Sequence, residues 1–438
     1  MRMPLFSRAK VAPKPAVGST APQPTAAPSL DYLPGAPGTD PNGLRGIDEH
    51  RDYLLSMIGE MRPFGIGLME ASGLTLCESL TSDLDLPIYT AATLEGWAIR
   101  ASNLAGASEL RPVILPIVGE VGAGDPRGAP LTPGTAVKVS AGAPVPEGAD
   151  AVVPFGYGLV VGNEVEFRVE ARFQQNLWLA GSRVADGDRL LGHGAMLTPR
   201  ALGLIAEVGH DKVLARPRPR VAVVTAATGL IEPGMPLTRL TERYDSTTTL
   251  LAASLRDDGA QVFASGIVSP DPRVVANAVS EQLVRADLVV LVADFTADLL
   301  VGMAGAGAFD VAQVDGFIAP LVFGLLGPDQ IPLLVLPLSP VPAYLAYELF
   351  GQPLVERLGG QEIGEPDLVD GHLTSPVESH EVRTQLVLAH STSAGVRPLP
   401  FIGDQGAAEL SDANTVIFVP AGEGTLAVGS GVVCWVLD

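Results

Sequence analysis

Cysteine, lysine and long apolar runs are the scarcest features of this sequence. Its two cysteines, Cys77 and Cys434, are too few for a disulfide framework or a cysteine zinc site, and such usage is typical of a reducing cytoplasm. No segment approaches the roughly 18 uninterrupted apolar residues that a membrane helix requires. The six histidines show no HxxxH or HxH spacing. The sequence therefore predicts a soluble cytoplasmic protein without a metal site.

Positive charge is also scarce. The chain has 28 Lys and Arg residues, only four of them lysine, against 49 Asp and Glu residues, and its formal net charge is -21. An average surface of this charge repels nucleic acid and phosphorylated molecules. We therefore expect no nucleic-acid partner, and any site for an anion has to be local.

Length and composition predict several domains. At 438 residues, 47% of them hydrophobic, the chain is long enough for about two to four cores of roughly 100 to 200 residues each. The first 45 residues contain nine prolines among Ala, Gly, Ser and Thr, a composition that cannot offset the entropy of ordering. Residues 1–45 are therefore predicted to be a disordered extension.

Regular structure is predicted from residue 46 onward. A helix begins near Ile47, where apolar residues recur at helical spacing and acids occupy the first turn. Residues 98–167 are rich in Gly and Pro between short Val and Ile runs, which is typical of a small β domain. From residue 220 onward strands alternate with helices; the predicted strands are 221–225, 262–268, 288–292 and 333–336, and the predicted helices are 246–257, 272–285 and 341–358. Short strands separated by glycine turns return after residue 380.

These segments predict an α/β multidomain fold with a parallel sheet covered by helices on both faces. The predicted domains are a linker domain I of helices and strands (46–87 and 168–215), a β-rich insertion domain II (88–167), an α/β domain III (216–362) and a β domain IV (363–438).

A long local motif carries a family resemblance. Residues 141–153 read AGAPVPEGADAVV, which resembles the TGAPxPxGADAVV motif of the MoeA and gephyrin E-domain family. Residues 218–223 and the Tyr-Asp-Ser at 244–246 also resemble family motifs, and the domain order is similar over nearly all of residues 46–438. The resemblance implies an elongated homodimer with the MoeA/gephyrin E-like fold, and molybdopterin molybdenumtransferase activity for intact members.

The family's chemistry has three needs. Its α/β domain binds an adenylylated pterin phosphate, and a metal-assisted step inserts molybdenum into the dithiolene. Acids are needed to hold Mg²⁺, glycines to let the backbone approach a phosphate, and cations to receive an anionic oxometalate.

This sequence departs from the family at each of these needs. The glycine loop SGGVSVG appears as residues 292–298 (VADFTAD), the lysine loop KPGKP as 316–320 (GFIAP), and the strand end STGDE as 225–229 (TAATG). Three further motifs, at 90–98, 141–144 and 176–183, also lose polar residues. The positions that correspond to the family's active site are Thr90, Glu95, Ala141, Ser182, Thr228, Asp245, Asp294, Gly316 and Ala319.

Two local alternatives concern the edge of domain III. Asp245 stands before a predicted helix, where an N-cap role is favoured over ligand contact. Phe295, Phe317 and Ile318 either fill the core or form a sticky surface, and core filling is favoured.

The selective loss of site residues favours a catalytically degenerate scaffold without a cofactor. Gephyrin-like proteins capture a receptor tail between the first helix and the C-terminal β domain, and that site falls on Asp48, Arg51, Tyr53, Val419 and Pro420. The chain resembles the actinobacterial gephyrin-like branch, which implies the FtsZ C-terminal tail as partner, recruitment to the division septum, and a membrane receptor as a further partner.

The alternative is a divergent molybdopterin molybdenumtransferase that uses Mg and molybdopterin adenylate. Its remaining acids would be Glu95, Asp150 and Asp245. A third hypothesis is a protein that binds the pterin without turnover.

Overall fold

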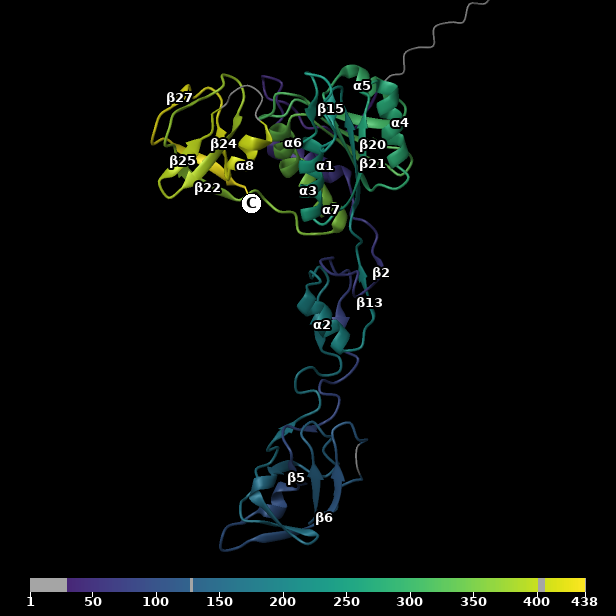
Figure 1. Cartoon of the computed structure of the whole chain (residues 1–438), viewed down its shortest axis with the longest axis vertical. Helices are drawn as coiled ribbons and strands as arrows, with labels where there is room; N and C mark the ends of the chain where they lie inside the picture. Colours follow the sequence, from purple (N-terminus) through teal and green to yellow (C-terminus); the bar gives the residue numbers. More distant parts are fainter. Residues whose placement is uncertain (1–29, 127–128, 401–405, 438) are drawn as a thin grey trace, which may run out of the picture.

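The computed structural model describes residues 30–126, 129–400 and 406–437. Figure 1 shows an elongated molecule in which an α/β head and a C-terminal β domain lie side by side, a narrow stalk leads away from the head, and a β domain forms the far end. None of the helices in these residue ranges is both long and apolar enough to span a bilayer.

The head is built on a seven-stranded sheet in the order β1-β19-β20-β21-β18-β14-β17. Its strands are β1 (Asp31–Tyr32), β14 (Arg220–Ala226), β17 (Gln261–Val268), β18 (Leu288–Ala293), β19 (Gly307–Ala312), β20 (Leu321–Leu326) and β21 (Ile331–Leu336). The predicted strands and helices of this region are confirmed, and the fold class is α/β with several small sheets. The predicted parallel sheet is parallel except at β20, which runs antiparallel to both β19 and β21.

Helices cover both faces of this sheet. One face packs on α1 (Ile47–Met57), α3 (Thr247–Asp257), α6 (Pro340–Ala346), a π-helical segment (Tyr347–Gly351) and α7 (Gln352–Gly359). The other face packs on α4 (Pro272–Gln282) and α5 (Ala297–Gly302). Val223 belongs to the first core and Val224 to the second, since successive strand residues point to opposite faces. Burial on both faces explains why these strands read as continuous Val and Leu runs.

Strand direction determines which loops meet. Because β14, β17, β18, β19 and β21 all point the same way, the loops that follow them lie at one edge of the sheet. The chain passes from β14 to β17 on one side and then returns to β18 on the other side of β14. This reversal creates a crevice at the carboxyl ends of β14 and β18, where open α/β sheets bind ligands.

The remaining sheets are smaller. The far β domain has the order β8-β5-β7-β6-β10-β9, with strands β5 (Gly96–Ile99), β6 (Val113–Val121), β7 (Ala136–Val139), β8 (Ala151–Pro154), β9 (Gly158–Val161) and β10 (Glu164–Phe167). The C-terminal β domain has the order β22-β28-β26-β24-β25, with strands β22 (Leu368–His372), β24 (Gln385–Thr392), β25 (Gly395–Pro398), β26 (Thr415–Val419) and β28 (Gly431–Val436).

The stalk contains α2 (Pro199–Glu207) beside the pair β2 (Phe64–Gly67) and β13 (Lys212–Ala215). The other short elements are β3 (Leu80–Thr81), β4 (Ala91–Ala92), β11 (Leu177–Trp178), β12 (Arg189–Leu191), β15 (Leu230–Ile231), β16 (Arg243–Tyr244), β23 (Val377–Glu378), β27 (Thr425–Leu426), α8 (Ala407–Asp412) and the 3₁₀ turns Ala101–Leu104 and Phe155–Tyr157.

The predicted disordered extension, residues 1–45, is too long, because residues 30–45 have a defined structure. Residues 30–45 run along β19: the backbone N–H of Leu33 donates to Phe309 O at 2.9 Å, and Arg45 forms a buried bidentate ion pair with Asp310 at 2.6 and 3.0 Å. These contacts compensate the entropy that the Pro-rich composition alone cannot offset. Residues 1–29 lie outside the described part of the chain, so the prediction of disorder for them stays a prediction.

A buried histidine lies beside this ion pair. His50 accepts a hydrogen bond at Nδ1 from Arg45 at 3.0 Å, and its ring meets Phe350 edge to face. Burial and then the Arg45 charge lower the pKa of His50 from 6.5 to about 4. Folded His50 is therefore neutral over a range in which unfolded His50 becomes charged.

We expect stability to fall as the pH drops from about 6.5 to about 4, because protons bind His50 more readily in the unfolded chain. The contribution is fully present above pH 6.5, and about 3 kcal/mol of it is lost by pH 4. Denaturant unfolding at several pH values measures the loss. His50→Gln should flatten this window; an unchanged pH dependence in the variant would contradict the assignment to His50.

Candidate functional site

Asp245 lies at the carboxyl edge of the head sheet, and its side chain is used within the fold. It is 5% exposed. One carboxylate oxygen accepts the Thr248 N–H at 2.9 Å and the other accepts the Thr248 hydroxyl at 2.5 Å. Because Thr248 donates its only hydroxyl hydrogen there, the contact between Thr225 and Thr248 has Thr225 as donor. Asp245 thus fixes the first turn of α3 beside the end of β14. The N-cap position itself is Ser246, so the predicted N-cap is one residue early, although the Asp245 carboxylate does accept a backbone N–H of the helix.

A cavity of about 200 Å³ opens beside this turn. Its lining includes Arg243 and Ser246 before α3, Leu338 and Pro340 before α6, and Gly406 of the C-terminal domain. Asp245 also lines the cavity, and its carboxylate already accepts the Thr248 N–H at the start of α3, so the lining group that suits an anion is the Arg243 guanidinium.

The other carboxyl-edge positions do not form a continuous polar site. Thr228 and Asp294 are exposed, and Gly316 and Ala319 are half-buried. Within the described ranges no three His, Cys, Asp or Glu side chains are grouped as metal ligands. Since Asp245 already accepts two hydrogen bonds, the residues present do not fit the Mg²⁺ that the family resemblance implies.

The apolar cluster in these loops splits into core and surface. Phe317 is 3% exposed and packs on Phe350 with ring centroids 5.8 Å apart, whereas Ile318 is 76% exposed. Phe295 is half-buried. Core filling is therefore confirmed for Phe317 and wrong for Ile318.

Four predicted positions lie away from the head within the chain. Thr90, Glu95 and Ala141 lie in the sequence range of the far β domain, and Ser182 lies in the loop between β11 and β12. The loops carrying Thr90 and Ala141 are joined, since the N–H of Val145 donates to Thr90 O at 2.9 Å. Glu95, Ala141 and Ser182 are exposed.

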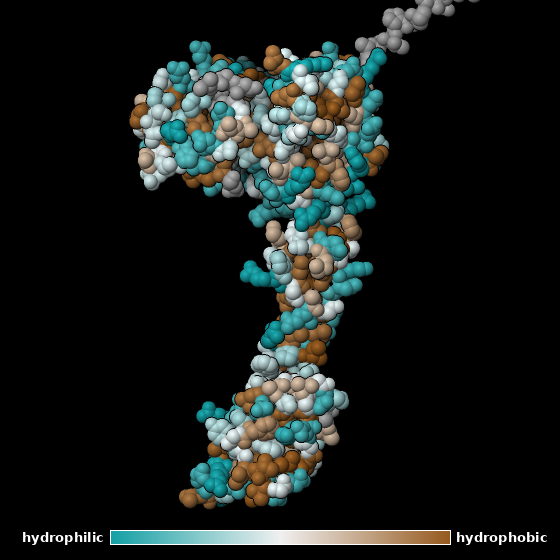
Figure 2. All heavy atoms as spheres, viewed as in Figure 1, coloured by the Kyte–Doolittle hydropathy of each residue, from teal (hydrophilic) through white to brown (hydrophobic). Residues whose placement is uncertain are grey.

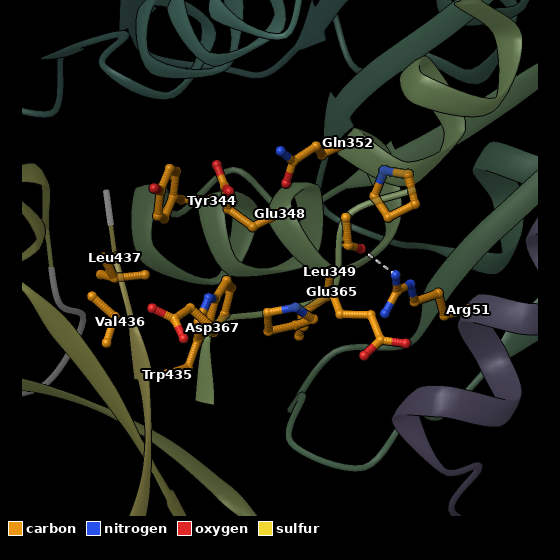
Figure 3. Close-up of a pocket in the computed structure, with 13 residues that line it drawn as sticks. Arg51, Tyr344, Glu348, Leu349, Gln352, Glu365, Asp367, Trp435, Val436 and Leu437 are labelled. Carbon is orange, nitrogen blue, oxygen red and sulfur yellow. Dashed lines mark hydrogen bonds between the residues drawn. The ribbon is translucent and has the colours of Figure 1, made fainter. Parts of the chain in front are cut away.

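The five predicted peptide contacts do not share a surface. Tyr53 is 5% exposed and its hydroxyl donates to Pro34 O at 3.1 Å, and Val419 is fully buried. Asp48 and Pro420 are exposed. Arg51 alone lines a cavity of about 140 Å³, where it donates to Gly364 O and faces the π-helical segment and β28 (Figure 3).

A larger cleft, which the sequence did not indicate, separates the head from the C-terminal β domain. Its volume is about 730 Å³. Gly316 and Ile318 form one wall, and His380, Arg383 and Leu386 belong to the other. The cleft therefore lies against the loop where the family carries its two lysines.

Arg383 donates a hydrogen bond to His380 in this cleft. Its guanidinium nitrogen lies 3.4 Å from His380 Nε2, and because arginine can only donate, Nε2 is the acceptor. The other ring nitrogen, Nδ1, lies 3.2 Å from the N–H of Val382. Across the described ranges, half-buried Arg383 has no carboxylate within ion-pair distance, although exposed Glu378 also lines the cleft. A guanidinium outside an ion pair is a local site for an anion in an acidic protein.

Comparison with known proteins agrees with this architecture. Residues 45–209 match the family model described as the MoeA N-terminal region (domain I and II). Molybdopterin molybdenumtransferase 2 of Mycobacterium tuberculosis is 29% identical over 413 residues, covering 90% of this chain and 99% of that protein. Molybdopterin molybdenumtransferase 1 of the same species is 28% identical and covers 88% and 97%.

Solved structures give the same fold. A crystal structure of a molybdopterin biosynthesis MoeA protein from Pyrococcus horikoshii superposes with a TM-score of 0.77 at 23% identity, and covers 90% of this chain and 99% of that chain. A second structure from that organism superposes with a TM-score of 0.65 at 21% identity, and covers 90% of this chain and 100% of that chain.

Residues 45–209 thus match the MoeA N-terminal family, and the chain is similar to molybdopterin molybdenumtransferases along nine-tenths of its length. The prediction of a scaffold for the FtsZ tail was wrong. The relatives along nine-tenths of the chain are named for molybdenum transfer, and nothing in the comparisons supports FtsZ binding or the divisome. The carried-over contacts failed because Tyr53 and Val419 lie in the cores. The homodimer stays a prediction.

Replacing Asp245 tests whether its carboxylate stabilises the first turn of α3 in the head. Asp245→Ala removes both hydrogen bonds to Thr248, so we expect about 1 to 2 kcal/mol lower free energy of unfolding. Urea unfolding followed by circular dichroism measures it. Exposed Asp294→Ala should change stability by less than about 0.5 kcal/mol; equal losses in both variants would count against the cap.

Proposed function

We propose that this chain carries out a divergent form of the reaction for which its relatives are named, the transfer of molybdenum to molybdopterin. Support comes from similarity along about 90% of the chain and from the cleft beside residues 316–320. The observation that carries the proposal is half-buried Arg383, next to His380 and without a carboxylate partner in the described residues.

The cleft suits a tetrahedral oxoanion. A guanidinium donates through a planar fork that matches the oxygen spacing of phosphate-like anions. The His380 ring, which accepts a hydrogen bond from Arg383, helps to fix the guanidinium beside the cleft. Since the chain carries a net charge of -21, an anion would be repelled elsewhere on the surface and held only where such donors converge. Molybdenum, presented as its oxoanion, is the substrate we assign to this cleft.

The pterin belongs at the crevice beside α3 in this proposal. The cavity there is bounded by Arg243 and by the start of α3, and the Arg243 guanidinium favours a phosphate of molybdopterin adenylate. Asp245 holds that helix turn in place through Thr248. Because the donor set does not fit Mg²⁺, no step of the proposal passes through magnesium.

The second candidate is a member of the same family that binds these ligands without transferring the metal. Two observations favour it: exposed Thr228 stands where an acid is expected, and both oxygens of Asp245 are used by Thr248. Loss of paired acids removes transition-state stabilisation that one binding cleft does not replace.

Two measurements distinguish molybdenum transfer from ligand binding without transfer. The full chain is expressed in a bacterial strain that lacks its molybdenumtransferase, and the purified protein is titrated with molybdopterin adenylate. Restored molybdoenzyme activity supports the transferase. Ligand binding without restoration supports the second candidate, and neither binding nor restoration contradicts the proposal in both forms.

Arg383 provides a direct test of the oxoanion cleft. Arg383→Gln should weaken molybdate binding at least about tenfold, because hydrogen bonds from a charged donor are lost. Isothermal titration calorimetry with molybdate measures the change. Arg397→Gln removes the same charge from an exposed position of β25 and should bind as the unaltered protein does. Equal weakening in both variants would point to general charge rather than to this cleft.

A further inference from the structure

Asp315 joins the two walls of the cleft through its carboxylate. One oxygen accepts the N–H of Thr384 at 2.8 Å, and the other accepts the Thr384 hydroxyl at 2.6 Å. The first oxygen also lies 3.0 Å from the N–H of Gly316. Asp315 belongs to the loop after β19 and Thr384 directly precedes β24, so these bonds connect the head to the C-terminal β domain.

The backbones of the two walls also approach closely here. Gly316 forms a parallel β-bridge with Gln385. Gly316 has φ of +88°, and a Cβ at this position would lie 3.3 Å from Leu386. A side chain at 316 would therefore press the walls apart as well as strain the backbone.

Each side of the Asp315–Thr384 contact is itself held. On the head side, the N–H of Asp315 donates to Arg45 O at 2.8 Å, and Arg45 is fixed by its buried ion pair with Asp310. On the other side, the N–H of His380 donates to the Gln385 side chain at 2.9 Å. The segment that carries His380 and Arg383 is thus closed on itself and attached to the head at Thr384.

We infer that Asp315 is a positioning residue whose hydrogen bonds to Thr384 hold Arg383 and His380 in the geometry that binds the oxoanion. The inference rests on the proposed function, since it concerns the same cleft. Thr384 is bonded through both its N–H and its hydroxyl, so the backbone direction of the adjacent Arg383 is fixed. Without this link the direction of Thr384 is no longer fixed, and the adjacent Arg383 loses the placement that suits the anion, although the Gly316–Gln385 bridge still joins the two walls.

The substitutions separate positioning from a general loss of stability. Asp315→Ala removes both acceptors, whereas Asp315→Asn keeps one carbonyl oxygen for the Thr384 N–H and offers an amide to the Thr384 hydroxyl. Thr384→Val removes only the hydroxyl bond. Asp329→Asn makes the same charge change in the exposed turn between β20 and β21, at the opposite edge of the sheet.

Molybdate titration of the full-length variants measures the effect. We expect about tenfold weaker binding for Asp315→Ala, about threefold for Thr384→Val, less than threefold for Asp315→Asn, and no change for Asp329→Asn. The double variant Asp315→Ala with Thr384→Val should bind no more weakly than Asp315→Ala alone, because both substitutions break one interaction. Amide exchange at Thr384 should accelerate in Asp315→Ala.

Two outcomes overturn the inference. Binding by Asp315→Ala equal to that of the unaltered protein excludes a positioning role, and additive losses in the double variant exclude action through Thr384. Failure of the unaltered protein to bind molybdate is a separate result, because it contradicts the proposed oxoanion cleft itself. If Asp315→Ala does not fold, molybdate binding by Asp315→Asn and Thr384→Val tests the inference instead. A graded loss of affinity supports the inference, and unchanged affinity in both variants contradicts it.

Discussion

The common direction of five strands in the head sheet is the constraint on which the candidate site depends. Since β14, β17, β18, β19 and β21 point the same way, their following loops collect at one edge although β14 ends at Ala226 and β21 at Leu336. Burial of both sheet faces fixes strand register, because a shift by one residue would exchange the two cores. The loops inherit their positions from that register.

In this acidic chain, arginines differ in whether a carboxylate neutralises their charge. Arg45 is buried and paired with Asp310, and Arg220 at the start of β14 is paired with Asp287. A buried unpaired charge is costly because the lost hydration is not replaced. Arg383 is half-buried, retains part of its hydration, and donates to an imidazole nitrogen rather than to a carboxylate. No carboxylate therefore offsets the attraction of Arg383 for anions, as a partner in an internal ion pair would.

Sequence patterns predicted the elements whose local sequence preference matches the structure that they adopt in the fold. The strand at 221–225 and the helix at 246–257 were found because a continuous apolar run and a helical period are local signals. The strand β20 reads LVFGLL and is buried on both faces, so its residues carry no sign of direction, and its antiparallel pairing follows from the turn to β21. Residues 30–45 were missed because their order comes from β19 and Asp310 rather than from their own composition.

The same distinction explains the site. Asp245 was recognisable because a cap acts on its own helix, over three residues. His380 and Arg383 carry no motif, and only the docking of the C-terminal domain through Gly316 and Gln385 brings them to the head. Tyr53 was assigned to the peptide site only because the family resemblance carried that site over, and a resemblance does not show which neighbour covers a helix face. Tertiary packing thus supplied the site residues that the sequence could not.

The missing lysines and the carboxylate of Asp315 are physically linked. Asp315 immediately precedes residues 316–320, where the family carries two lysines and this chain has Gly316 and Ala319. Lysine ammonium groups on this loop would compete with Thr384 for the carboxylate, since a charged donor binds it more strongly than a hydroxyl does. A Cβ at position 316 would also press on Leu386. An attachment between head and C-terminal domain at Asp315 therefore requires the loop to lose its cations, and the positive charge of the cleft then comes from the opposite wall.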